Sequence, residues 1–363
     1  MRFPLLDPIN RMTKAYVIPL PSPTGGWNAF NNLGAMPPTD AIIMDNLMPE
    51  ETGVRLRGGD ELFASGMSGV VETLKEYVSP TTNELLAASD GNVYEISTGT
   101  PVLKGSGFTN AQWQTVNFQS HMYWANGADI VQDYTAPTLG NTGFTGPVLT
   151  DIINVNLLFN RIWFVEKDSG SAWHGAAAAI SGAMTEFKVG EFARSGFLMQ
   201  VASWSRDSGL GMDDFTVFIM STGQILVYTG DITSTVTLVG KYSAPPPIGR
   251  RCTINIGGEL VILTTSGYLS MTNIMQGKIT ATDAVSWKIR DAVAQAVAVG
   301  GSLVGWSFEM SPDERELIVN VPKSTTEFNQ HVYNTVIQGW GRWLDRNTHS
   351  IGTLNNDLYG GFS

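Results

Sequence analysis

Cysteine is almost absent from this sequence of 363 residues, in which Cys252 is the only one. A single cysteine excludes an internal disulfide and a cysteine-rich zinc site. Cys252 stands in the alternating segment RRCTINIGG, a pattern that predicts a small buried hydrophobic residue more than a reactive thiol.

Charge is also scarce, since charged residues make up 15% of the chain and the formal net charge is −11. No run of lysine or arginine stands out. A protein that binds DNA without regard to sequence needs a basic stripe to displace counterions, so tight nucleic-acid binding is not expected. An acidic wall would instead let DNA pass without adhering to it.

Long apolar runs are missing. The N-terminal stretch MRFPLLDPINRMTKAYVIPLP is interrupted by prolines and charges, so it lacks the core of a signal peptide. No run of eighteen apolar residues exists, and the sequence therefore predicts no membrane anchor.

Motifs for catalysis or metal binding are absent as well. The four histidines lie far apart, and the chain has no P-loop and no GxSxG elbow. Neighbouring acids occur at Glu50-Glu51, Asp213-Asp214 and Asp313-Glu314, and we interpret the last two pairs as solvated turns. We therefore expect no catalytic residue, no bound metal and no cofactor.

The sequence is rich in glycine, with 39 residues, and in tryptophan and tyrosine, with ten each. From residue 61 onward, short runs of alternating apolar and polar residues recur, and each ends in small polar residues. They extend from 70–78 to 341–345 and include 121–125, 161–166, 224–229 and 259–264. Turns such as Asp90-Gly91 and Thr222-Gly223 are typical of tight hairpins. Hairpins recur about every 40 residues, the spacing of four-stranded propeller blades.

These patterns predict an all-β fold. We expect a β-propeller-like domain over residues 61–363, with about six or seven short-stranded blades, because radial repetition protects the edges of many short strands. A β-sandwich or an irregular barrel is the alternative. Residues 283–299, DAVSWKIRDAVAQAVAV, show helical spacing and predict one amphipathic helix inserted between blades.

Residues 1–60 differ from the rest because prolines punctuate them. Proline fixes φ and removes a backbone donor, so this stretch is predicted to be an extended N-terminal arm. Such an arm either lies on a neighbouring subunit or straps its own domain.

Three regions resemble one known family. The first, residues 25–59, carries Trp27-Asn28, Asp45-Asn46, Pro49, Gly53, Arg55, Arg57 and Gly58. This order of residues is similar to the N-terminal stretch of the tail nozzle, or packaged-DNA-stabilisation, proteins of short-tailed bacteriophages. Residues 216–270 resemble the central blades of that family, and the closing segment VYNTVIQGWGRWLDRNTHSIGTLNNDLYGGF resembles its last blade.

The resemblance implies a structural virion protein of the tail, assembled in the host cytoplasm, and not an enzyme. It implies a ring homo-oligomer, usually a hexamer, that extends the DNA channel and retains the genome before ejection. The implied partners are portal or adaptor proteins, tail fibres or spikes, and genomic DNA that passes without specific binding. Within the first region, Trp27, Asn28, Arg55 and Arg57 are the expected subunit contacts.

Two other hypotheses remain open. One is a propeller glycosidase or lyase that acts on surface polysaccharide with two carboxylates across a cleft. The other is a carbohydrate- or receptor-binding module that stacks its ligand on exposed aromatic rings. Trp340 and Trp343 of WGRWLDR are the candidates for such stacking, unless they pack between sheets.

Overall fold

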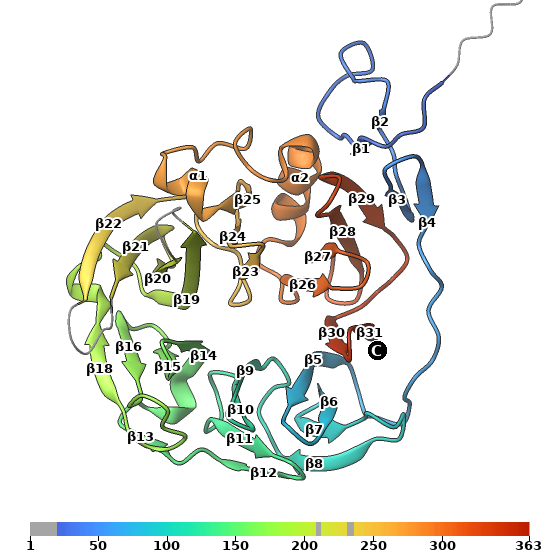
Figure 1. Ribbon diagram of the computed structural model, residues 1–363. Helices are drawn as coiled ribbons and strands as arrows, with labels where there is room; N and C mark the ends of the chain where they lie inside the picture. The colour runs from blue at the N-terminus through green and yellow to red at the C-terminus, as the bar shows by residue number, and fades with distance from the viewer. Residues whose placement is uncertain (1–19, 208–211, 231–235, 363) are drawn as a thin grey trace, which may run out of the picture.

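The computed structural model describes residues 20–207, 212–230 and 236–362. Six antiparallel sheets stand around a central axis in chain order, so the all-β prediction is confirmed as a six-bladed β-propeller (Figure 1). In each blade the first strand lies nearest the axis and the following strands lie progressively further out (Figure 1).

The first three blades have four strands each. Blade 1 contains β5 (Val71–Val78), β6 (Asn83–Ser89), β7 (Asn92–Glu95) and β8 (Val102–Ser106). Blade 2 contains β9 (Gln114–Phe118), β10 (His121–Ala125), β11 (Gln132–Thr135) and β12 (Thr138–Asn141). Blade 3 contains β14 (Ile152–Leu158), β15 (Arg161–Glu166), β16 (Ser171–His174) and β18 (Thr185–Lys188).

The next three blades complete the circle. Blade 4 contains β19 (Leu198–Asp207), β20 (Met212–Met220), β21 (Gln224–Thr229) and β22 (Thr237–Ser243). Blade 5 has only three strands, β23 (Thr253–Ile256), β24 (Glu259–Thr264) and β25 (Gly267–Ser270). Blade 6 contains β26 (Ser307–Ser311), β27 (Glu316–Pro322), β28 (Phe328–Asn334) and β29 (Gly339–Trp343).

The core is divided into sectors, each between two adjacent blades. Tyr77 and Leu86 of blade 1, for example, pack with Trp113 and Trp124 at blade 2, and equivalent clusters join the later blades. The apolar residues of the strands therefore form the interfaces between adjacent blades, because each sheet must bury both of its faces against its neighbours.

A hairpin fills the gap between blade 6 and blade 1. It consists of β30 (Ser350–Leu354) and β31 (Asp357–Gly361) (Figure 1). The amide of Val71 donates to the carbonyl of Phe362 at 3.2 Å, and the hydroxyl of Ser350 donates to the carbonyl of Val71 at 2.7 Å. The C-terminal residues thus close the ring against the first blade.

The predicted helix is present but shorter. A 3-10 turn at Trp287–Ile289 leads into α2 (Arg290–Gly300), whereas residues 283–286 form turns. A short helix that we did not predict, α1 (Met271–Met275), follows β25 directly. The two helices stand where blade 5 lacks a fourth strand (Figure 1). None of the helices in the described ranges is long and apolar enough to span a bilayer.

The described part of the N-terminal arm follows the outer edge of blade 6. It contains the parallel pair β1 (Gly26–Trp27) and β2 (Asp40–Ala41), then the hairpin β3 (Leu47–Pro49) and β4 (Val54–Leu56). Residues 44–46 run parallel to β29, where the amide of Asn46 donates to the carbonyl of Arg342 at 2.7 Å and the amide of Arg342 donates to the carbonyl of Met44 at 3.0 Å. This part of the arm therefore straps its own domain.

A glycine makes this close approach geometrically feasible. A Cβ atom at Gly341 of β29 would lie 2.5 Å from the carbonyl oxygen of Leu47 and 2.7 Å from the sulfur of Met48. Any larger residue would push β3 off the blade.

The remaining short elements lie in segments that connect the strands of the blades. They are the parallel pair β13 (Phe144–Thr145) and β17 (Gly182–Ala183), and the 3-10 turns Leu149–Asp151 and Val189–Glu191. One expected turn is wrong, because Asp213-Asp214 lies at the start of β20 and pairs with β19.

Candidate functional site

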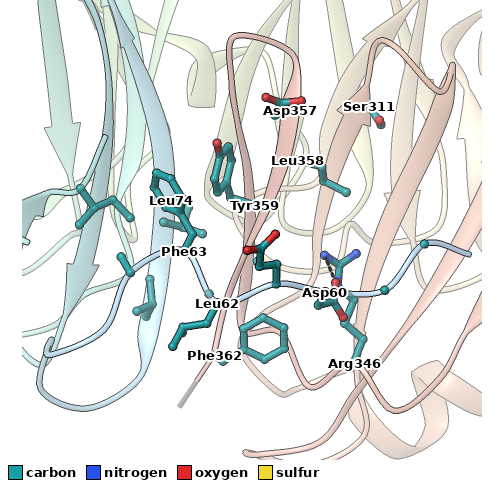
Figure 2. A pocket seen from close by; sticks show the side chains of 18 of the residues that line it. Asp60, Leu62, Phe63, Leu74, Ser311, Arg346, Asp357, Leu358, Tyr359 and Phe362 are labelled. Atoms are coloured by element: carbon teal, nitrogen blue, oxygen red, sulfur yellow. Dashed lines mark ion pairs between the residues drawn. The ribbon is translucent and has the colours of Figure 1, made fainter. Parts of the chain in front are cut away.

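After β4 the chain crosses from blade 6 to blade 1 as an irregular segment, residues 57–70. Between this crossing segment, the β30–β31 hairpin and the turn that joins β26 to β27 lies a groove of about 950 Å³. Figure 2 shows the side chains of both walls converging on it. We call it the arm groove.

Arg55 joins the arm to blade 6 at one end of the groove. Its guanidinium donates to Glu314 at 2.6 Å, to Glu316 at 2.9 Å and to Glu50 at 3.1 Å. Burial raises the pKa of Glu316 to about 7, against the opposing effect of Arg55. Three carboxylates thus share one cation, and the most buried of them titrates near neutral pH.

A second polar cluster occupies the middle of the groove. Asp60 of the crossing segment forms an ion pair with Arg57 at 3.1 Å. It forms a second ion pair with Arg346 at 2.7 Å, which Figure 2 shows. Both guanidinium groups lie over the ring of Trp343, at 5.9 and 5.3 Å from its centroid. Burial lowers the pKa of Arg346, but this group keeps its charge because an arginine pKa lies far above neutrality.

The other end of the groove is apolar. Phe63 meets Tyr359 edge to face with their centroids 4.8 Å apart (Figure 2). Leu62 and Phe362 line the same region and remain exposed. The groove therefore combines carboxylates, which exceed arginines among its lining residues, with uncovered apolar side chains.

The four predicted contact residues fall in two places. Arg55 and Arg57 line the arm groove, where their contact with another subunit stays a prediction. Trp27 and Asn28 are buried within the chain's own structure. The indole of Trp27 donates to the carbonyl of Ile42, and Asn28 donates to Asp40 at 2.8 Å, so these two side chains position the arm instead of offering a free surface.

Trp27 also borders a second, smaller cavity of about 370 Å³ between α2 and blade 6. The guanidinium carbon of Arg342 lies 4.9 Å from the centroid of the Trp27 ring, and the ring centroids of Trp27 and His331 are 5.5 Å apart. The hydroxyl of Tyr268 lies 2.8 Å from Nδ1 of His331. Burial, and to a lesser extent the charge of Arg342, lowers the pKa of His331 to about 3, which keeps this ring neutral.

The candidates for ligand stacking are not exposed. Trp340 and Trp343 lie on opposite faces of β29 and are 1% and 5% exposed. Neither ring therefore offers the exposed face that the stacking hypothesis required of these two residues. Among the described residues, no group of three or more histidine, cysteine, aspartate or glutamate side chains is arranged to hold a metal ion.

Two adjacent arginines at the start of blade 5 make contacts that no pattern in the sequence indicated. Arg251 donates to the carbonyls of Glu72 and Trp113 and to the hydroxyl of Thr73, at 2.8–3.2 Å. These acceptors belong to β5 of blade 1 and to the residue before β9 of blade 2. Neither blade is next to blade 5, so the side chain reaches across the propeller axis. Arg250 similarly donates to the carbonyl of Asn126 at 3.2 Å, and the axis of one propeller is therefore crossed by protein.

The sequence also did not reveal the role of Asp60, Arg346 and the hairpin that forms one wall of the groove. The pair Arg-Asn at 346–347, close after the aromatic strand, was the only available signal, and it does not reveal that Asp60 lies opposite.

No protein-family model matches this chain, and no curated protein matches it. Among solved structures, it is similar to the WD40 β-propeller domain of Doa1, with 10% identity and a TM-score of 0.48 over 83% of this chain and 92% of that one. It is also similar to the computationally designed Ika8 protein, with 9% identity and a TM-score of 0.46 over 84% and 97%. BBS1N, in its complex with ARL6DN, has 12% identity and a TM-score of 0.46 over 80% and 86%. Likenesses this distant carry nothing about what the chain binds.

Proposed function

We propose that this chain is a structural subunit of a bacteriophage tail, a nozzle subunit whose N-terminal arm assembles it into a ring. The ring extends the DNA channel, retains the packaged genome and carries fibres or an adaptor on its outer faces. The order of the three family-like sequence regions supports this proposal.

One structural observation carries the assembly part of the proposal. Of the 22 large hydrophobic side chains that are exposed among the described residues, nine lie within residues 20–63. Seven of these belong to the arm, namely Leu20, Phe30, Leu33, Ile42, Ile43, Val54 and Leu56, and two, Leu62 and Phe63, belong to the crossing segment that follows it. Apolar side chains gathered on one segment are typical of a surface that another protein covers.

The crossed propeller axis and the negative net charge both bear on where a DNA channel would run. Because Arg250 and Arg251 cross the axis of a single propeller, a DNA channel would run between copies. A net charge of −11 would keep DNA from adhering to the wall of such a channel.

Native mass spectrometry and electron microscopy of the purified protein test the proposal. We expect a closed ring, and we expect the double variant Leu33→Ser, Ile43→Ser to shift the protein toward monomer. The matched control is Val239→Ser on β22, an exposed valine in blade 4, which should leave the ring intact. A chain that stays monomeric at all concentrations, also with its adaptor partner, would contradict the proposal.

The virion itself gives a second test. Particles assembled without this chain should lose packaged DNA, which a nuclease-protection assay measures. Particles that keep their DNA and eject it normally would rule out the nozzle role.

A further inference from the structure

The arm groove offers carboxylates without an ionic partner. Arg55 and Arg57 engage Glu314, Glu316 and Asp60, but none of the ion pairs among the described residues involves Glu61, Asp313 or Asp357. These three acids are exposed and line the groove. A ligand that carries positive charge would therefore be attracted to it.

The same groove leaves apolar surface uncovered. Leu62 is 79% exposed and Phe362 is 40% exposed, although both line the groove. Two stretches of chain, residues 58–67 and 356–362, form its long walls. An elongated site of about 950 Å³ with apolar and acidic parts fits an extended peptide better than a compact metabolite.

The first 19 residues of the chain have the complementary composition. They contain Arg2, Arg11 and Lys14 but only one acid, Asp7, which makes a formal charge of +2. The rest of the chain then carries −13, since the whole has −11. Apolar residues such as Leu6 and Ile9 stand among these charges.

We propose that the arm groove binds residues 1–19 of a neighbouring copy. This inference rests on the proposed ring, because the segment must come from another subunit. Apolar residues of the segment would cover Leu62 and Phe362, while its basic residues would face Glu61, Asp313 and Asp357.

The position of the arm favours a neighbour as the source. Residues 44–46 are fixed along β29, and the described chain begins beyond β2, outside the ring of blades (Figure 1). Leu20, its first residue, is 90% exposed. The groove lies at the other end of the arm, beside β31, so the segment of the same copy starts away from it.

Disulfide trapping tests the proposal in the full-length chain. The only native cysteine, Cys252, is fully buried, which leaves a clean background. Chains with Ile9→Cys are mixed with chains with Leu62→Cys under mild oxidation and run on a non-reducing gel. We expect a covalent dimer that contains one chain of each kind, identified by mass. The control mixes Ile9→Cys with Val239→Cys, where the cysteine lies on blade 4, and should give no dimer.

The double-cysteine variant separates a neighbour from the same copy. Ile9→Cys, Leu62→Cys in one chain should give a ladder of linked chains. An intramolecular link alone, which leaves the chain monomeric on the gel, would overturn the exchange between copies. No link in either experiment would overturn the groove as the binding site, while a ring seen by native mass spectrometry would still support the proposed function.

Charge reversal checks the chemistry of recognition. Asp313→Lys, Asp357→Lys should lower the initial rate of trapping about tenfold, because like charges then face each other. Adding Arg11→Glu and Lys14→Glu to the partner should restore most of that rate. If the protein proves monomeric, a fluorescent peptide of residues 1–19 is titrated into it, and saturable binding that Asp313→Lys, Asp357→Lys weakens keeps the groove assignment. Absence of binding then rejects it.

Discussion

The burial of a neutral His331, where the arm packs on blade 6, leads to a prediction about how stability depends on pH. Its ring lies 3% exposed beneath Trp27 of the arm and beside Tyr268 of blade 5. Its pKa falls to about 3, because the protonated form would lose its hydration and would lie near Arg342. We predict that the folded chain loses stability in mild acid, because this histidine binds a proton more readily in the unfolded chain.

The direction and size of this loss of stability follow from the difference in the pKa of His331 between the folded and unfolded chains. In the unfolded chain a histidine binds a proton below about pH 6.5, whereas the folded chain resists that proton until about pH 3. Stability is therefore lost progressively as the pH falls below 6.5. At pH 5.0 the loss is about 2 kcal/mol, from 1.5 pH units at about 1.36 kcal/mol per unit.

Urea unfolding followed by tryptophan fluorescence measures this loss. The variant His331→Gln retains a carbonyl that can accept from the hydroxyl of Tyr268 but cannot be protonated in this range. The free energy of unfolding of the variant minus that of the wild type should rise by about 2 kcal/mol between pH 7.5 and pH 5.0. Comparing the two proteins removes the contributions of other titrating groups, such as Glu316, which both share.

A difference that stays constant within about 0.5 kcal/mol between the two pH values would refute the reasoning. It would mean that His331 titrates alike in the folded and unfolded chains, which a ring buried beside Arg342 should not do.

Three further predictions concern other parts of the fold. Arg251→Met removes the donor that spans the axis and leaves backbone acceptors unpaired, so the free energy of unfolding should fall by about 3 kcal/mol in urea. Gly26→Ala places a Cβ atom 2.7 Å from the backbone of Trp340 at a residue with φ of +82°, so limited trypsin digestion should cut the arm faster while the propeller stays intact. Glu316→Gln removes an acid whose folded pKa is raised to about 7. Wild-type stability is lost as the pH rises from about 4.5 to 7, so the variant should gain up to about 3 kcal/mol relative to the wild type between pH 4.5 and pH 8.

Matched controls accompany these variants. Arg194 is exposed, and Arg194→Met should change stability by less than about 0.5 kcal/mol. Gly53 has no heavy atom within 4 Å of a built Cβ and no positive φ, so Gly53→Ala should leave trypsin cleavage unchanged. Equal effects in a variant and its control would contradict the corresponding assignment. For Glu316→Gln, a difference from the wild type that does not vary with pH would contradict the raised pKa.

Four strands in the middle of their blades were predictable to the residue. The ranges expected for β10, β15, β21 and β24 coincide with the observed strands, because these strands are buried on both faces and consist of continuous apolar residues between polar turns. Asp90 and Gly91 also have positive φ, 47° and 70°, as the expected hairpin turn requires.

Some outer strands were missed for the opposite reason. β8 and β18 have mostly exposed or half-buried residues, so no alternation marks them, and only pairing with the preceding strand makes them strands. The helix pair beside blade 5 is a similar case. Periodicity indicated α2, but that the helices would stand in the place of a fourth strand depends on the packing of blades 5 and 6.

The sequence by itself determined the class of fold, because short alternating runs with glycine turns can bury their apolar faces only by stacking sheets. It also drew attention to Arg55 and Arg57. Tertiary structure alone decided what they contact, since Arg55 meets Glu316 across 261 positions of the chain. It also decided that Trp27 is buried and that Arg251 crosses the axis, because such contacts depend on which blades the closed ring brings together.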